Sequence, residues 1–313
     1  MSGHVITNSV SRRGGRRSFM ALVRRAGPAY AFLLPGFVVF TLVMVYPTIK
    51  VFLVSLQNWS PVPGAQNEFV GLANYVRAAK DPIVWRALEN SGLYMLVTVL
   101  GQMVLGLACA LALNAAFRGR TAFRVMIYVP VITSWVVVSI LFRYLFQGDG
   151  SLANYVLAAA GHAPVIWLGG RWTGMAVTCA LGVWKGVGWT MLIFLSALQA
   201  VPAELHEVAE VDGAGWWARF LNVTVPAIRR TTFFIAIMLV IGAFNVYISV
   251  ALITNGGPAN LTQVPLIYLY QQAFNFLDFG FGSAIAFVLT AIILALSLVQ
   301  FSVGERVSGD AVA

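Results

Sequence analysis

Long apolar segments alternate with shorter polar segments along the chain. Six of the apolar segments reach or exceed the roughly 20 residues that an α-helix needs to cross the hydrocarbon core of a bilayer. The predicted spans are Ala29–Leu56, Ser91–Phe117, Val125–Phe146, Trp172–Ala200, Thr231–Thr254 and Phe281–Val303. Pro35, Pro47 and Pro130 predict bends in the first and third spans, because proline removes a helical hydrogen bond. The pattern predicts an all-α membrane protein with six transmembrane helices.

Basic residues are concentrated in alternate connections between the predicted spans. The segments before the first span and after the second, fourth and sixth spans carry Arg12, Arg13, Arg16, Arg17, Arg24, Arg25, Arg118, Arg120, Arg124, Arg219, Arg229, Arg230 and Arg306. The other connections carry only Arg77, Lys80, Arg86 and Arg171. Because cytoplasmic loops of membrane proteins are enriched in Lys and Arg, both termini are predicted to be cytoplasmic. The predicted organisation is a basic cytoplasmic tail (1–28), a six-helix transmembrane domain (29–304) and a cytoplasmic tail (305–313).

The composition agrees with a chain that lies mostly in the membrane. The sequence is 59% apolar and only 10% charged, whereas soluble domains carry about a quarter charged residues. The net charge of +9 comes largely from arginines beside the predicted spans, and not from a folded basic surface, so no nucleic-acid role is predicted. Cys109 and Cys179 lie in apolar segments, and no disulfide is predicted.

Several kinds of chemistry have no candidate residues in this sequence. Acidic residues lie outside the predicted spans or at their ends, and only Lys185 lies well inside a span. This disfavours a cation-coupled carrier, which keeps ionisable groups near the bilayer midplane. None of the lysines follows a glycine, so no ATP-binding P-loop is present, and the scattered histidines predict no metal site. The chain is predicted to be no enzyme and to bind no cofactor, so transport energy would come from another subunit.

The connection 201–230, between the fourth and fifth predicted spans, is unusually acidic. Pro202 is suited to begin a helix, and Asp212 with Gly213 would end it. The carboxylates of this helix are Glu204, Glu207 and Glu210, and the aromatic residues after it are Trp216, Trp217 and Phe220. Glu207 and Glu210, three positions apart, would share a face that could meet arginines of a partner. A capped interfacial helix with a solvated acidic face explains the same residues without a partner.

The segment from Glu207 to Pro226, EVAEVDGAGWWARFLNVTVP, resembles the E-A-A-x-x-D-G-A motif of the membrane subunits of bacterial binding-protein-dependent ABC importers. Val208 replaces the first alanine of that motif. In those proteins the motif forms the helix through which an ATPase subunit moves the membrane subunit. The resemblance assigns ATPase coupling to Glu207, Ala209, Asp212, Gly213, Ala214, Phe220 and Pro226.

Three further segments resemble one branch of this family, the carbohydrate permeases of the maltose and glycerol-phosphate type. They are FVGLANY at 69–75, Gly119-Arg120 with Phe123-Arg124 before Pro130, and TNGGP at 254–258 followed by Thr262. The resemblance implies a type I ABC importer permease bundle in the bacterial cell membrane. The implied partners are a sister permease in a heterodimer, two ATP-binding subunits that carry ATP and Mg, and an extracytoplasmic solute-binding protein. The implied mechanism is alternating access.

The resemblance also assigns a substrate path to Trp135, Lys185, Gly186, Asn245, Tyr247 and Ser249. Sugar sites combine aromatic faces with polar groups, and these residue types supply both. Packing is the simpler explanation for Gly182 and Gly186, whose spacing of four is typical of a close helix contact. Lys185 has several possible partners: sugar hydroxyls, an anionic substrate, a carbonyl, or a carboxylate of the sister subunit.

The function predicted from these features is import of di- or oligosaccharides. Within the family, the alternative is import of glycerol-3-phosphate or a related phosphodiester. From a different class, the alternative is a stand-alone channel or a structural membrane protein, which would have no ATPase partner.

Overall fold

The computed structural model describes residues 19–64 and 67–309, and the chain forms two compact units that meet in sequence between Val51 and Phe52. The first unit holds α1 (Phe19–Phe40), the π-helical turn η1 (Thr41–Val45) and most of α2 (Tyr46–Ser55). The π-helical turn lies just before Pro47, one of the prolines for which a bend was predicted. π-helical segments are rare and occur mostly as single turns of this kind inside α-helices.

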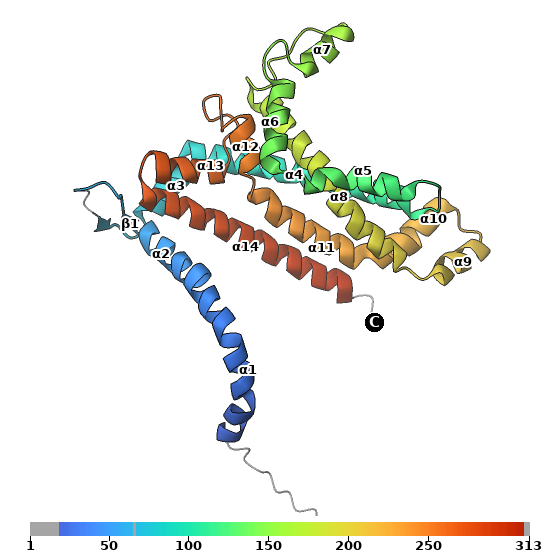
Figure 1. Cartoon of the computed structure of the whole chain (residues 1–313), viewed down its shortest axis with the longest axis horizontal. Helices are drawn as coiled ribbons and strands as arrows, with labels where there is room; N and C mark the ends of the chain where they lie inside the picture. Colours follow the sequence, from blue (N-terminus) through green and yellow to red (C-terminus); the bar gives the residue numbers. More distant parts are fainter. Residues whose placement is uncertain (1–18, 65–66, 310–313) are drawn as a thin grey trace, which may run out of the picture. The chain divides into compact units, whose positions relative to one another are not determined.

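The second unit is almost entirely helical. Its elements are β1 (Gln57–Asn58), β2 (Glu68–Phe69), α3 (Ala73–Lys80), α4 (Pro82–Asn114), α5 (Arg120–Ile132), α6 (Trp135–Phe146), α7 (Leu152–Ala159), α8 (Arg171–Gln199), α9 (Ala203–Val211), α10 (Trp216–Arg219), η2 (Phe220–Thr224), α11 (Val225–Phe244), α12 (Ile248–Ile253), α13 (Pro265–Tyr270), η3 (Gln271–Asn275) and α14 (Phe279–Gly309) (Figure 1). The two short strands pair antiparallel, with Gln57 opposite Phe69.

The centre of this unit is the contact between α4 and α8, which lie side by side, with α11 packed on α4 and α14 on α11 (Figure 1). Glycines make the close approach possible. A Cβ at Gly182 would overlap the Tyr94 hydroxyl, and a Cβ at Gly186 would overlap the Gln102 side-chain amide. Small residues let helices in a membrane approach closely. The prediction that Gly182 and Gly186 form a close helix contact is therefore confirmed.

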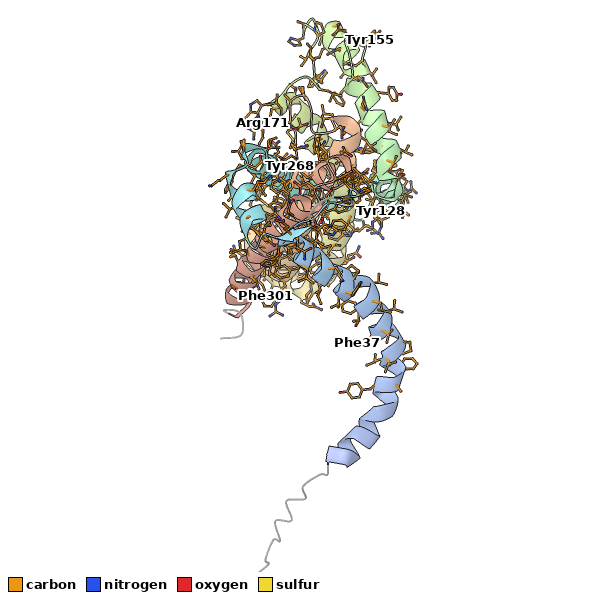
Figure 2. The ribbon with its side chains drawn as sticks, turned by 90° about the vertical axis from the view of Figure 1, so that its left-hand side faces the viewer. Phe37, Tyr128, Tyr155, Arg171, Tyr268 and Phe301 are labelled. Atoms are coloured by element: carbon orange, nitrogen blue, oxygen red, sulfur yellow. The ribbon has the colours of Figure 1, made fainter. Side chains whose placement is uncertain are left out.

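The apolar surface of the helices is largely uncovered, as expected for helices in contact with lipid. Phe37 on α1, Tyr155 on α7 and Phe301 on α14 are exposed (Figure 2). Among the described residues, five helices are long and apolar enough to span a bilayer, or six if the bent pair α5 and α6 is counted as one span.

The third predicted span, Val125–Phe146, is not one continuous helix. α5 and α6 meet at an angle of 93°, with Thr133 and Ser134 in extended conformations between them. The break follows Pro130, and it is stabilised by the Thr133 hydroxyl, which donates to the Pro130 carbonyl at 2.6 Å. A side chain that bonds the backbone in this way competes with helix continuation. The bend predicted at Pro130 therefore falls a few residues further along the chain.

The fifth predicted span, Thr231–Thr254, is also interrupted. α11 ends at Phe244, and α12 begins at Ile248. The Asn245 side chain donates to the Ile241 carbonyl at 2.8 Å, which satisfies one of the carbonyls left free at the end of α11.

Several helices extend beyond the predicted spans. The connection 57–90, predicted as an outer loop, contains α3 and the first turns of α4. α4 begins at Pro82 because the Asp81 side chain accepts a hydrogen bond from the Ile83 amide at 2.7 Å and caps the helix. Hydropathy misses this start because the first turns are polar. α1 is described from Phe19 and α14 extends to Gly309, so both helices continue into the segments predicted as tails; residues 1–18 and 310–313 lie outside the described part.

Two of the motif segments outside 201–230 hold loops together through side-chain hydrogen bonds. Asn74, from the segment FVGLANY, donates to the carbonyls of Ser55 and Gln57 at 3.0 and 2.9 Å. In the segment after α12, the Thr262 hydroxyl oxygen lies 2.7 Å from the Gly257 carbonyl oxygen and 2.8 Å from the Thr254 hydroxyl oxygen, so its single proton is shared between two acceptors. These contacts close the loops at the ends of α2 and α12.

A buried amide joins the same region to the central helices. The Asn90 side chain donates to the carbonyls of Leu261 and Gln263 at 2.9 and 2.8 Å. Its oxygen accepts a hydrogen bond from Arg171 Nε at 2.9 Å. One fully buried asparagine therefore connects α4, the start of α8 and the loop before α13.

Candidate functional site

The acidic connection folds as predicted into a short helix with a tight end. α9 begins directly after Pro202, and Asp212 is its C-cap. Gly213 has a positive φ of 78°, its amide donates to the Glu210 carbonyl at 3.0 Å, and the Ala214 amide donates to the Ala209 carbonyl at 2.9 Å. This pair of hydrogen bonds defines a Schellman motif, in which glycine avoids the strain of a left-handed residue. The D-G-A part of the motif is thus the helix end.

The two acidic residues predicted to face a partner differ in their surroundings. Glu210 forms an ion pair with Arg219 of α10 at 2.7 Å, so its carboxylate already has a cation within the chain. Glu207 is exposed on α9. Both side chains are exposed, but Glu207 has no ion pair within the part of the chain that the structure describes.

Aromatic residues after α9 form a compact group. Phe220 stacks on Trp216 with the rings 5.5 Å apart and nearly parallel, and Trp217 lies 4.6 Å from Trp216. Trp216 and Phe220 line a cavity of about 550 Å³ together with residues from the ends of α4 and α8, including Leu198. Pro226 follows the π-helical turn η2 and lies in the first turn of α11. Trp216 and Phe220 therefore face the ends of α4 and α8 across this cavity.

The six residues assigned to a substrate path lie around two neighbouring cavities. The first, here the Lys185 cavity, has a volume of about 310 Å³ and is lined by Trp135, Lys185 and Gly186. The second, the Tyr247 cavity, has a volume of about 350 Å³, and its lining residues include Trp135, Asn245, Tyr247 and Ser249. Both are also lined by Tyr94 and Gly242. The structure therefore brings together residues from α6, α8, α12 and the break between α11 and α12.

α4 also contributes to these cavities, although none of its residues was predicted to lie there. Tyr94, Thr98 and Gln102 line the Lys185 cavity. They recur at every fourth position of an otherwise apolar segment, which places them on one face of the helix. This polar stripe was the signal that could have identified them.

Lys185 is buried, with 3% of its surface exposed, and its ammonium group donates to backbone carbonyls. The distances are 2.7 Å to Pro130, 2.6 Å to Thr133 and 3.3 Å to Val131. Of the partners considered from the sequence, a carbonyl is the one that the structure shows. The Lys185 ammonium also lies 4.9 Å from the centre of the Trp135 ring, within the range of a cation–π contact.

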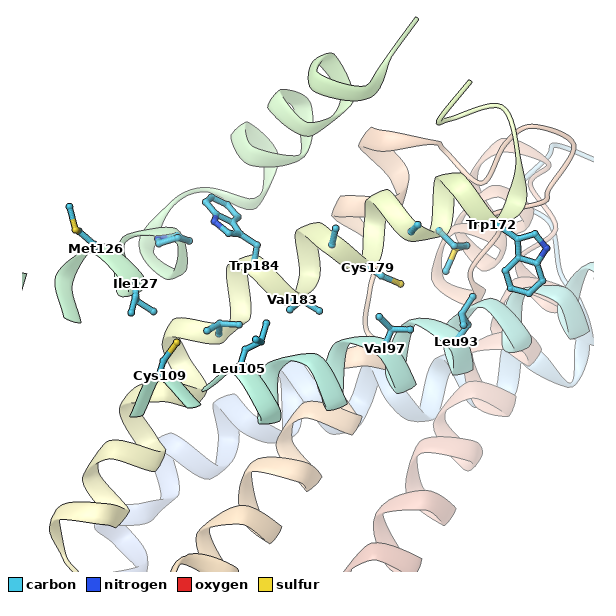
Figure 3. Close-up of a pocket in the computed structure, with 15 residues that line it drawn as sticks. Leu93, Val97, Leu105, Cys109, Met126, Ile127, Trp172, Cys179, Val183 and Trp184 are labelled. Atoms are coloured by element: carbon cyan, nitrogen blue, oxygen red, sulfur yellow. The ribbon is translucent and has the colours of Figure 1, made fainter. Parts of the chain in front are cut away.

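A larger cavity of about 900 Å³ lies between α4, α5 and α8 (Figure 3). Its lining is almost entirely apolar and includes Leu105, Val183 and Trp184. A sugar site needs polar groups for its hydroxyls, and this lining does not supply them. The smaller cavities are therefore the better candidates for a sugar site.

Comparison with known proteins identifies the class. Residues 102–309 match the family described as "Binding-protein-dependent transport system inner membrane component". The chain is 33% identical to the arabinooligosaccharides transport system permease protein AraP of Bacillus subtilis (strain 168), covering 98% of this chain and 97% of that protein. It is 31% identical to the lactose transport system permease protein LacF of Rhizobium radiobacter, covering 87% of this chain and 92% of that protein.

A solved structure has the same fold. The chain aligns with a TM-score of 0.80 and 20% identity to a subunit of a bacterial ABC transporter involved in the import of the acidic polysaccharide alginate, covering 92% of this chain and 98% of that one. The protein is thus a membrane permease of the ABC transporter class. It belongs to the family of binding-protein-dependent transport system inner membrane components, which confirms the resemblance seen in the sequence.

Proposed function

We propose that this chain forms part of the translocation path of an ATP-driven importer for neutral di- or oligosaccharides. The lining of the Lys185 and Tyr247 cavities carries the proposal. It offers the aromatic rings of Tyr94, Trp135 and Tyr247 beside amide and hydroxyl groups, the combination suited to sugar faces and hydroxyls. Among the described residues that line the two cavities, none is a carboxylate and only Lys185 is charged.

The hydrogen bonds of the Lys185 ammonium group favour neutral solutes over phosphorylated ones. A phosphate or sulfonate group would need a cation free to pair with it. The Lys185 ammonium is instead surrounded by three backbone carbonyls. This favours a saccharide over glycerol-3-phosphate, in agreement with relatives whose names specify arabinooligosaccharides, lactose and trehalose/maltose.

The membrane arrangement is part of the same proposal. The broken pair α5 and α6 counts as one of six spans, and both termini lie in the cytoplasm. This is supported by the five or six suitable helices among the described residues and by the distribution of arginines. It would bring α9, with its exposed Glu207, to the cytoplasmic face, where an ATPase can dock.

The proposed assembly is a heterodimer with a sister permease, two ATP-binding subunits that hold ATP and Mg, and an extracytoplasmic solute-binding protein. Closure of the ATPase dimer on ATP would move α9 and open the path outward, and hydrolysis would reset it. Membership of a binding-protein-dependent family supports this assembly over a stand-alone channel.

The test is ATP hydrolysis by the purified complex with its binding protein, across neutral saccharides, acidic saccharides and glycerol phosphates. Stimulation by a neutral saccharide is expected. Stimulation only by phosphorylated polyols would mean that the importer is specific for that class and not for neutral saccharides. If the permease did not copurify with an ATPase, the proposed function would be wrong.

A further inference from the structure

The break between α5 and α6 leaves backbone groups that need partners. The last four carbonyls of any α-helix have no partner within the helix, and water is scarce inside a membrane bundle. At the end of α5 the Pro130 carbonyl accepts from the Thr133 hydroxyl at 2.6 Å. The carbonyls of Val131 and Thr133 receive their side-chain donor from another helix, α8.

That donor is Lys185. An ammonium group has three N–H donors, and three carbonyls lie within 3.3 Å of Nζ. A cation at a helix C-terminus is also favoured by the helix dipole. Lys185 therefore caps α5 from a neighbouring helix, across more than fifty residues of sequence.

The same ammonium also contacts the other half of the broken span. Trp135 is the first residue of α6, and its ring centre lies 4.9 Å from Lys185 Nζ. The Trp135 ring lines both the Lys185 cavity and the Tyr247 cavity. One buried side chain thus contacts the end of α5, the start of α6 and the aromatic ring that the two cavities share.

We propose that Lys185 is a positioning residue: it holds the break of the third span and thereby sets the place of the Trp135 ring against the solute, without pairing with the solute itself. The inference rests on the proposed function in taking the two cavities as the solute site. It assigns the aromatic contact with the solute to Trp135 and explains why a buried cation can serve a path for neutral sugars.

The test is a double-mutant cycle on the complete complex, with the neutral saccharide that best stimulates its ATP hydrolysis as probe. The variants are K185Q, W135A and the double variant, with the exposed Lys80→Gln as a matched control. The readouts are the saccharide concentration for half-maximal stimulation and the maximal rate. If Lys185 acts through Trp135, each single variant raises the half-maximal concentration about tenfold, and the double variant resembles W135A. The inference would be overturned if the double variant raised the half-maximal concentration by the product of the two single effects. It would also be overturned if K185Q left that concentration unchanged.

A second variant covers the case in which K185Q fails to assemble. Thr133→Val removes the hydroxyl that donates to Pro130 and loosens the same break while Lys185 stays in place. It should raise the half-maximal concentration severalfold in wild type and have no further effect in the W135A background. If Thr133→Val raised the half-maximal concentration as much in the W135A background as in wild type, the break would not act through Trp135.

A third measurement separates positioning from charge recognition. K185Q should weaken stimulation by a neutral and by an acidic saccharide by the same factor. A selective loss for the acidic saccharide would mean that Lys185 pairs with the solute. If no saccharide stimulates the wild-type complex, the proposed function fails, but the cycle can still be measured with whichever solute does stimulate it.

Discussion

Gly188 lies where α8 passes close to the backbone of α5, and replacing it by alanine is a direct test of that packing. A Cβ at this position would overlap the Ile127 carbonyl oxygen and lie 3.0 Å from the Cα of Tyr128. Both neighbours are backbone atoms, which cannot move aside as the end of a side chain can. The whole of α5 would have to shift away from α8.

The size of the effect follows from a comparison with Gly92 of α4, where an added Cβ meets nothing within 4 Å. Both positions lie inside long helices, so the gain in helix propensity, up to ~1 kcal/mol, is shared by the two substitutions. Overpacking costs about 1–3 kcal/mol and applies to Gly188→Ala alone. The free energy of unfolding of the two variants should therefore differ by about 1–3 kcal/mol.

The assay is the thermal midpoint of each purified complex in detergent, followed by loss of its gel-filtration peak. Gly92→Ala should match or exceed wild type, and Gly188→Ala should melt at least ~2 °C below Gly92→Ala. Equal midpoints for the two alanine variants would refute the argument that α5 and α8 are in backbone contact at Gly188.

Three further substitutions address the loops. Glu207→Lys should leave insertion and assembly intact but lower ATP-driven uptake about tenfold or more, because it reverses the exposed charge proposed to dock the ATPase. Wild-type uptake by the assembled variant would show that Glu207 does not dock the ATPase. Gly213→Val places a side chain at a positive φ, so it should destabilise the end of α9 by about 1–2 kcal/mol and weaken copurification with the ATPase. The control Gly215→Val lies at a negative φ and should have neither effect. Equal copurification of the two variants would count against the Schellman turn. Asn154→Ala removes hydrogen bonds to Gly148, Val165 and Trp167, so limited proteolysis should cut the loop between α6 and α8 faster than in wild type; an unchanged cleavage rate would show that Asn154 does not hold this loop together.

The parts of the fold that follow from local sequence could be predicted. The apolar segments located the long helices, and Pro202 with Asp212-Gly213 located α9 to within a residue, because caps and left-handed turns depend on neighbouring residues. The start of α4 was missed because Asp81 and Pro82 begin the helix in a polar stretch that hydropathy does not see.

The parts that depend on contacts across the chain could not be predicted. Pro130 indicated a bend, but the Thr133 hydroxyl and the distant Lys185 determine where the break falls and how its carbonyls are satisfied. From the sequence alone, Lys185 had several possible partners, and only the packing of α8 against α5 selects the carbonyls. The six path residues were named together by resemblance, yet the stripe from α4 that completes their cavities went unnoticed.

The break in the third span also bears on how the protein is made. A continuous membrane helix satisfies its own backbone and can enter the bilayer as a finished unit. The segment from α5 to α6 does not satisfy its own backbone in this way. The carbonyls of Val131 and Thr133 accept hydrogen bonds from an ammonium group that is synthesised more than fifty residues later. Until α8 has been synthesised, these two carbonyls lack the donor that they have in the folded chain. The bent shape of the segment from α5 to α6 therefore depends on a helix that follows it in the chain.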